Sequence, residues 1–407
     1  MQVVHERCRG LDIHKRTVVV ACVLTPEGSE TRTFGTMTDD LETLAAWLAH
    51  RGVTQVAMES TSVYWKPIYN VLETYDFELV VANAQHIKAV PGRQTDVRDA
   101  AWLADLLRPG LVRASYLPGR AERELRELVR YRKSLIRERA AEVNRVQKVL
   151  EGANIKLGAV ATDVLGKSGR AMVEALIGGA TDPKAIASLA RGKLQAKQGD
   201  LERALRGVVG AHQRLILAAQ PRHITFLDEQ IEQLSQELAE RQRPCAAAVE
   251  QLQPIPGVGR RTAAVMLAEV GPDMSRFPTA GHLASWAGVC PGQNESAGQQ
   301  RSGRTRKGSP GLREALTEAA RAAARTRRTY LAAQYHRLAA RRGGNRAAVA
   351  VAHTILIIVH RLLSTGGGYE ELGANYFDER DKTATVKRAG ARLARLGFEV
   401  TLTPRVA

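Results

Sequence analysis

Hydrophobic and polar positions over the first 107 residues alternate between the spacing of strands and that of helices. The predicted strands are 9–15, 17–24, 31–37, 54–60 and 78–83, and the predicted helices are 38–52, 64–75 and 94–107. The first three strands form a meander, and the later strands alternate with helices. This is the element order of an α/β RNase H-like domain, which we expect at residues 1–115.

Long helical patterns replace this alternation after residue 116. Residues 121–150 predict a strongly basic helix with an imperfect apolar stripe. A coiled-coil seam of two heptads follows at Ile224, Leu227, Ile231, Leu234 and Leu238. The two long helices are expected to pair, either with each other or with those of another subunit. We predict a helical coiled-coil region at 116–245, in which residues 151–210 lack a periodic pattern.

A new helical pattern begins after Pro244. Residues 252–271 place a Pro-Gly-Val-Gly turn between two helical segments, as in a helix-hairpin-helix. In such an element Gly257 and Gly259 let the backbone approach a phosphate, and Arg260 and Arg261 follow directly. A plain tight turn between two packed helices is the alternative. We predict a mainly α domain at 246–335 and a helical extension at 336–407.

Basic residues crowd the segment that begins with a glycine-rich stretch at 292–308. Between residues 301 and 346 there are 13 Lys or Arg and 2 Glu. Ser309 and Pro310 are expected to cap the next helix, which leaves a long loop before them. A solvated charge run is the ordinary explanation, but this density beside such a loop favours a nucleic-acid surface. The predicted contacts in the loop are Arg301, Arg304, Arg306 and Lys307.

The overall charge supports a polyanionic partner. The chain has 59 Lys and Arg against 42 Asp and Glu, a net charge of +17. Aromatic residues make up 5%, so phosphate contacts rather than base stacking should dominate binding.

One segment raises the question of a membrane. Residues 347–360 are strongly apolar but shorter than the roughly 20 residues that a span needs, and they include His353. A buried core helix without membrane contact is therefore expected. Residues 1–15 lack the apolar run of a secretion signal, which predicts a cytoplasmic protein.

Two carboxylates stand three residues apart at Asp96 and Asp99, near the start of a predicted helix. On a helix they share one face and repel each other. Either Thr95 caps the helix and the dipole tolerates both, or a divalent cation lies between them. Asp12 in the first strand and Glu59 at the end of the fourth favour the cation, because these strands are neighbours in an RNase H-like sheet. Four carboxylates from three segments would hold one or two Mg²⁺ ions.

Several motifs carry a resemblance to a known family. They are GLDIHK, AMEST, QTDVRDAAWLA, PIPGVGRRTAAVMLAEVG, FPTAGHLASWAG and SAGQQRSGRTRKGSPGLR. In this order they resemble the DEDD transposases of insertion-sequence family 110, over about residues 8–107 and 250–325. The resemblance implies that Asp12, Glu59, Asp96 and Asp99 form the metal-binding quartet of a RuvC-like domain. It also implies a catalytic serine in the C-terminal transposase domain, at Ser296.

The same resemblance implies a recombinase guided by a structured bridge RNA, which pairs with donor and target DNA. Ser302 and Ser309 are alternative nucleophiles, although Ser309 looks like a helix cap. A homo-oligomer, a dimer or a tetramer, is expected because DNA exchange requires two duplexes to be held together. A RuvC-type structure-specific nuclease would need the carboxylates but no serine, and a non-catalytic nucleic-acid-binding protein would need neither.

Overall fold

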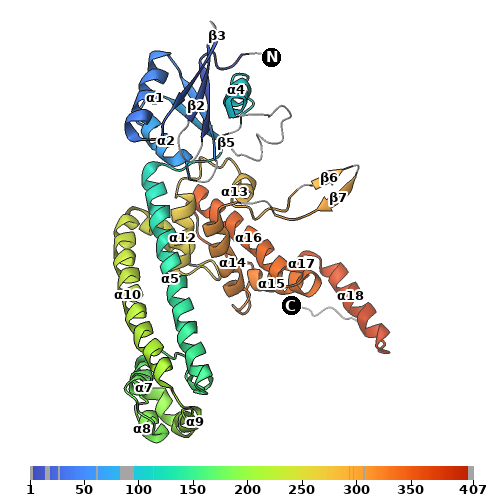
Figure 1. Cartoon of the computed structure of the whole chain (residues 1–407). Coiled ribbons are helices and arrows are strands. Elements are labelled where there is room, and N and C mark those ends of the chain that lie inside the picture. Colours follow the sequence, from blue (N-terminus) through green and yellow to red (C-terminus); the bar gives the residue numbers. More distant parts are fainter. Residues whose placement is uncertain are drawn as a thin grey trace. The chain divides into compact units, whose positions relative to one another are not determined.

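The computed structural model describes residues 3–13, 19–25, 28–60, 63–82, 96–112, 114–292, 294–296, 298–305 and 308–401. Contacts between residues divide the chain into two compact units, residues 1–117 and 118–407 (Figure 1). The finer division into four domains stays a prediction, and its boundary at residue 335 falls inside helix α15 (Tyr330–Arg342).

The first unit is built on a five-stranded sheet with the order β3-β2-β1-β4-β5. Its strands are β1 (Cys8–Ile13), β2 (Val19–Thr25), β3 (Gly28–Phe34), β4 (Gln55–Glu59) and β5 (Glu78–Ala82). The first three strands are antiparallel neighbours, whereas β4 runs parallel to both β1 and β5. The predicted meander and the predicted contact between the first and fourth strands are therefore confirmed. Strand β3 begins three residues earlier than expected.

Helices cover both faces of this sheet (Figure 1). Helices α1 (Thr38–His50) and α2 (Trp65–Leu72) share one hydrophobic core with Leu11 and Met58 of the strands. Helix α4 (Asp96–Leu107) packs on the opposite face through a second core, which contains Ala57. Successive strand residues alternate between these two cores because side chains along a strand point to opposite faces.

The second unit contains two long helices, α5 (Arg120–Gly152) and α10 (Ala211–Arg241), that pair with each other in antiparallel directions. Arg241 near the end of α10 bonds Glu124 near the start of α5, and Arg139 in the middle of α5 bonds Asp228. The seam residues Ile231 and Leu234 are half-buried. The seam predicted from the sequence therefore forms within one chain.

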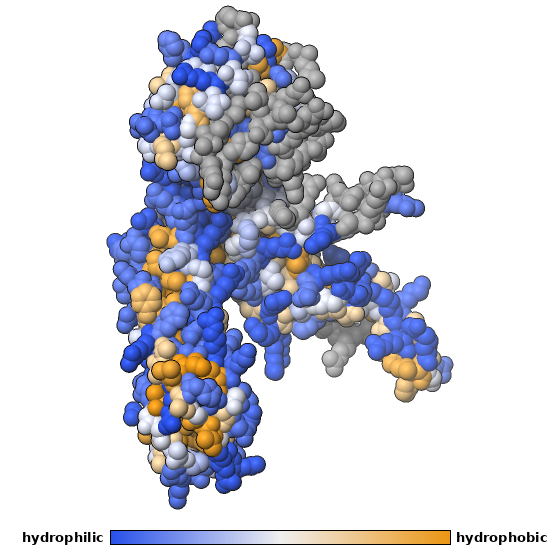
Figure 2. Space-filling view, in the orientation of Figure 1, coloured by the Kyte–Doolittle hydropathy of each residue, from blue (hydrophilic) through white to orange (hydrophobic). Residues whose placement is uncertain are grey.

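A cluster of short helices closes the far end of this pair, in residues 151–210, where the sequence has no periodic pattern. The elements are α6 (Leu157–Val160), α7 (Lys167–Ile177), α8 (Pro183–Ala187), η1 (Gly192–Lys197) and α9 (Gln198–Ala204). They enclose a hydrophobic core with Leu150 of α5 and Leu217 of α10. Figure 2 shows hydrophobic residues gathered at this end of the pair.

The second unit contains further helices besides α16 (Gly344–Thr365). They are η2 (Arg243–Cys245), α11 (Ala246–Leu252), α12 (Arg260–Val270), α13 (Ala280–Trp286), α14 (Pro310–Ala323), α15, α17 (Tyr376–Arg380) and α18 (Lys382–Arg395). Helix α16 is the one described helix that is long and apolar enough to cross a membrane. Its Val351, Ile355 and Val359 are buried, and it packs on α11, α13, α14 and α15. This agrees with the predicted core helix.

Candidate active site

The carboxyl-terminal ends of β1 and β4 bring Asp12 and Glu59 to one face of the sheet. In the parallel register Leu11 pairs with Met58, and the next residue along each strand is the acidic one. Leu11 and Met58 face α1 and α2, so the alternation of side chains directs Asp12 and Glu59 to the face covered by α4. The sequence predicted this adjacency, and the register supports it.

Helix α4 runs along β1 in the opposite direction, which leads its first turn toward Asp12. The Cys8 Sγ lies 3.7 Å from the carbonyl oxygen of Ala104, and Gly10 lies against Ala100. A step of two residues along β1, from Cys8 to Gly10, therefore matches a step of four residues back along α4, from Ala104 to Ala100. Each step covers roughly 6 Å. One further step leads from Gly10 to Asp12 and from Ala100 to Asp96, where α4 begins.

This site combines donors that suit a hard divalent cation. Glu59 is 9% exposed, and Asp12 and Asp99 are half-buried. Carboxylate oxygens are the ligands that Mg²⁺ prefers, so the donor set fits that ion. No three described His, Cys, Asp or Glu side chains lie close enough together to hold a metal; the side chain of Asp96 is outside the described part.

Gly10 permits the close contact between β1 and α4. A Cβ on this residue would come to 2.1 Å from the carbonyl oxygen of Ala100 and 2.6 Å from the Ala104 nitrogen. Both atoms belong to the backbone of a packed helix and cannot move independently. A glycine inside a strand is a sequence signal for such an approach, and Gly10 in GLDIHK carries this signal.

We expect Gly10→Ala to lower the free energy of unfolding by about 2–3 kcal/mol, because the extra methyl group pushes α4 away from the sheet. Cleavage activity should fall with it, since the helix carries two of the four candidate metal ligands, Asp96 and Asp99. Chemical denaturation of the full chain measures the change. The matched control is Gly199→Ala in α9, where a Cβ would meet no atom within 4 Å and no loss is expected. Equal stability of both variants would contradict the proposed packing role.

Ser296 lies in a short hairpin that the sequence predicted as a loop. Strand β6 (Asn294–Ser296) pairs antiparallel with β7 (Gln299–Ser302), and Ser296 is opposite Gln299. Gly298 has a φ of +73°, a conformation that favours glycine, and it closes the turn directly after the serine. The backbone at Ser296 is thus at the hairpin's tip. The side chains of Ser296 and Ser302 are outside the described part.

Ser309, the third candidate nucleophile, acts as a helix cap. Its hydroxyl accepts a hydrogen bond from the Leu312 amide at 3.4 Å and donates one to Glu269 at 2.8 Å. Pro310 occupies the first turn of α14, as the sequence predicted. These contacts give Ser309 a structural role and weaken its candidacy as a nucleophile.

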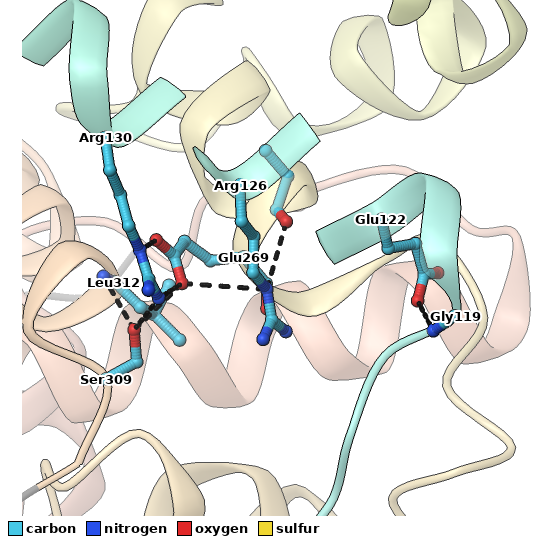
Figure 3. A network of polar contacts seen from close by, with 8 residues as sticks. Gly119, Glu122, Arg126, Arg130, Glu269, Ser309 and Leu312 are labelled. Atoms are coloured by element: carbon cyan, nitrogen blue, oxygen red, sulfur yellow. Dashed lines mark hydrogen bonds and ion pairs between the residues drawn. The ribbon is translucent and has the colours of Figure 1, made fainter. Parts of the chain in front are cut away.

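Glu269 is the centre of a buried polar network that ties α5 to α12 and α14 (Figure 3). Its carboxylate is 0% exposed and accepts two hydrogen bonds of 2.8 Å from Arg130. Arg126 donates to the backbone carbonyl oxygens of Ala268 and Glu269. The hydrogen bond to Glu269 is the largest cause of a raised Arg130 pKa. No local pattern indicates this pairing, because its members are 139 residues apart.

Glu269→Ala should destabilise the second unit by about 2–4 kcal/mol, because it leaves Arg130 and Ser309 without their buried acceptor. The Arg130 side chain is 46% exposed, so water screens part of the loss. Thermal and urea unfolding of the full chain measure it. Glu318→Ala is the control, since Glu318 is 61% exposed and bonds Lys133 of the same helix α5. A loss of stability no larger than that of the control would contradict a stabilising role of the network between α5, α12 and α14.

The predicted helix-hairpin-helix agrees with the structure in its order of helix, turn and helix, and the phosphate contacts of its glycines stay a prediction. Helices α11 and α12 flank the turn, and Gly257 has a φ of +84°. A Cβ on Gly257 would lie 2.2 Å from the Ala319 carbonyl oxygen, so this glycine permits the close packing of α14. Gly259, directly before α12, has no atom within 4 Å of its Cβ position and stays open. Arg260 and Arg261 are exposed at the same helix start.

Of the four basic loop residues predicted to contact nucleic acid, the structure describes Arg304 and the backbone of Arg301. Arg304 is exposed, and its carbonyl oxygen accepts from Gly292 at 3.1 Å across the base of the hairpin. Arg301 lies in β7, and its side chain is outside the described part. Arg306 and Lys307 lie outside the described residues altogether.

Two family models match the chain. The model of DEDD transposases of the IS110 type, described as "Transposase", matches residues 9–155. The model described as "Transposase IS116/IS110/IS902 family" matches residues 249–337. Together they cover more than half of the chain, and the first spans all three segments that carry the carboxylates. The fold and its acidic edge thus belong to a DEDD transposase.

Similar proteins agree with this class. A "Probable family 20 transposase" of Pseudomonas aeruginosa is 27% identical over 282 residues, which are 68% of this chain and 73% of that protein. The "Insertion element IS110 uncharacterized 43.6 kDa protein" of Streptomyces coelicolor is 65% identical over 37 residues, 9% of each chain. The chain belongs to the IS110 family of transposases. Membership implies that it binds and processes DNA.

Proposed function

We propose that this chain is a DNA recombinase of an insertion sequence, in which a Mg²⁺-binding carboxylate quartet and Ser296 cut and rejoin strands under the guidance of a bridge RNA. The observation that carries the proposal is the convergence of the β1 end, the β4 end and the α4 start in an RNase H-like sheet. If the carboxylates served only in helix caps and turns, the three sequence-distant segments that carry them would have no reason to lie at one edge of the sheet.

Asp12, Glu59, Asp96 and Asp99 are the residues that would hold the metal. Bound Mg²⁺ supplies polarisation of the phosphodiester and stabilisation of the attacking and leaving oxygens. Divalent metals are usual for DEDD domains, and the choice of Mg²⁺ rests on the all-oxygen donor set. Glu59 is the most buried of the described three, so it would fix the site's position on the sheet.

Ser296 is the proposed nucleophile. Its Oγ forms a bond to phosphorus while the bond from phosphorus to the 3′ oxygen breaks, so the enzyme keeps a 5′-phosphoserine link. The serine loses its proton and the departing 3′ oxygen gains one. A second DNA 3′-hydroxyl then attacks the phosphoserine, which restores Ser296 and the phosphodiester. A serine hydroxyl is a poor nucleophile unless a base, a metal or a positive field activates it. The exposed Arg304 beside the hairpin supplies positive charge.

The RNA partner is proposed from the family resemblance and is supported by charge. A net charge of +17 favours binding of polyanions, and both DNA and RNA are polyanions. Cytoplasmic location likewise stays a prediction.

Self-association is a further part of this proposal, because strand exchange joins two duplexes. The α10 seam is occupied by α5, so another surface must serve. Leu215, Ile216 and Phe226 of α10 remain exposed. Light scattering of the full chain with and without RNA tests whether it forms a dimer or tetramer; a constant monomer mass would exclude it.

The principal rival is a RuvC-type structure-specific endonuclease, which would use the same carboxylates and water as nucleophile. A covalent protein–DNA adduct distinguishes the two, since water leaves none. The RNA component has its own test: RNA that copurifies with the protein is sequenced, then removed and restored in a cleavage assay. Loss and recovery of site-specific cleavage are expected. Cleavage at the same site without RNA would contradict guidance.

A further inference from the structure

A cavity of about 540 Å³ opens where the helix pair meets the hairpin of α11 and α12. Its floor is apolar and formed by residues from three helices, among them Val129 of α5, Leu238 of α10 and Val249 of α11, each less than 10% exposed. Its volume is within the range of small-ligand pockets, about 300–1,000 Å³. The cavity is therefore large enough for more than water.

Positive charge surrounds this apolar floor. The lining contains Arg132 of α5, Arg243 of η2, Arg260 and Arg261 of α12, and one acid, Glu250 of α11. Arg243 is paired with Glu240, and Arg132 donates to Ser235 Oγ at 2.6 Å. Burial lowers the pKa of Arg132, and the nearby charge of Arg261 lowers it further. Arg132 and Arg261 thus line the same cavity and are close enough for their positive charges to repel each other.

The start of α12 adds further donors beside the same cavity. Gly259 caps this helix without a side-chain hydrogen bond, and its Cβ position is open. The first backbone N–H groups of a helix and its positive dipole end favour a phosphate. Arginines and a helix start at the rim, over a hydrophobic floor, match a ligand with an anionic part and a flat apolar part.

We propose that this cavity holds one unpaired nucleotide of the nucleic acid that the protein handles, with its phosphate on Arg260, Arg261 and the α12 start and its base on the apolar floor. A duplex keeps its bases paired and stacked, so only a single-stranded or extruded nucleotide presents a base face to a closed floor. Gln242 and Glu250 at the wall can bond the polar edge of the base. The inference rests on the proposed function only in requiring a nucleic-acid partner.

The test compares binding of four fluorescent probes to the full chain: single-stranded RNA, single-stranded DNA of the same sequence, the same RNA with abasic sites, and a duplex. Ala264→Leu fills the floor without changing charge. It should weaken binding of one or both intact single strands by about tenfold and leave the abasic and duplex probes unchanged. The strand that loses more affinity identifies whether RNA or DNA supplies the nucleotide.

Arg261→Gln should instead weaken all four probes and reduce the slope of log K against log salt by about one. Arg206→Gln, an exposed arginine between α9 and α10, is the charge-matched control. If Ala264→Leu lowers the melting temperature, Ala246→Leu at the exposed edge of the same cavity replaces it.

Unchanged binding of every probe by the filled variants, or an equal loss for duplex and single strands, would overturn the proposal. These outcomes do not depend on strand cleavage. The wild-type chain can fail to form a DNA adduct while the probe comparison still succeeds, so failure of the proposed chemistry and failure of the nucleotide pocket are distinguishable.

Discussion

Strand cleavage is expected to fall by roughly 10³-fold or more in each of the variants Asp12→Asn, Glu59→Gln, Asp96→Asn and Asp99→Asn, because each loses a ligand that contributes several kcal/mol to transition-state stabilisation. Folding should be unaffected. Replacing one carboxylate by an amide removes repulsion from a cluster of like charges, so the melting temperature of the protein without metal should stay constant or rise. Cleavage of a labelled DNA substrate in Mg²⁺ and a thermal melt measure both effects.

Removal of the metal with EDTA should abolish wild-type cleavage and leave RNA binding unchanged, since phosphate contacts come from arginines and lysines. Asp105→Asn is the matched control, because Asp105 lies on the exposed face of the same helix α4. Its cleavage rate should equal that of the wild type. Near-normal cleavage by any of the four variants would remove that residue from the ligand set.

Ser296→Ala should bind RNA and DNA with normal affinity and normal salt dependence but form no covalent adduct and no recombinant product. The reason is chemical: the variant lacks the oxygen that attacks phosphorus, whereas the charged residues are intact. Denaturing gels of reactions with labelled DNA give the readout.

Ser302→Ala is the control for Ser296, since it removes a hydroxyl from the partner strand of the same hairpin. It should keep the adduct. Loss of the adduct in Ser302→Ala but not in Ser296→Ala would transfer the nucleophile to β7.

Local patterns predicted much of the first unit. The strand meander, α1 with its end two residues before Gly52, and the neighbouring positions of β1 and β4 followed from periodicity and element order. The cap at Ser309 followed from a serine directly before a proline. The strand meander, the helix end and the cap depend on residues close in sequence, so propensity and turn chemistry are sufficient to reveal them, whereas the adjacency of β1 and β4 followed from the order of the elements.

Features that depend on distant residues were not predictable. Glu269 looks like an ordinary helix residue until α5 brings Arg130 to it. The close packing of Gly257 against α14, a helix more than 50 residues later, has no local sign in the turn motif. The short helices of residues 151–210 are stabilised by their shared core and not by their own periodicity, because most have seven residues or fewer.

The β6–β7 hairpin is an intermediate case. Its strands have three and four residues and are polar, so no alternation of apolar residues marks them. Gly298 was recognised as a loop residue, and its positive φ is the feature that turns the chain between the strands. The sequence therefore located the turn near Ser296 but not the strands around it.

The central claim is that the carboxylate edge and Ser296 together cut DNA through a protein–DNA link. The most direct measurement is mass spectrometry of the peptide attached to DNA after wild-type protein, its RNA and a DNA substrate react in Mg²⁺ and are denatured. We predict a single 5′-phosphoserine adduct on Ser296, which is absent with EDTA and in the Asp12→Asn variant. Cleaved DNA without any attached peptide, or an adduct on a different residue, would contradict the account.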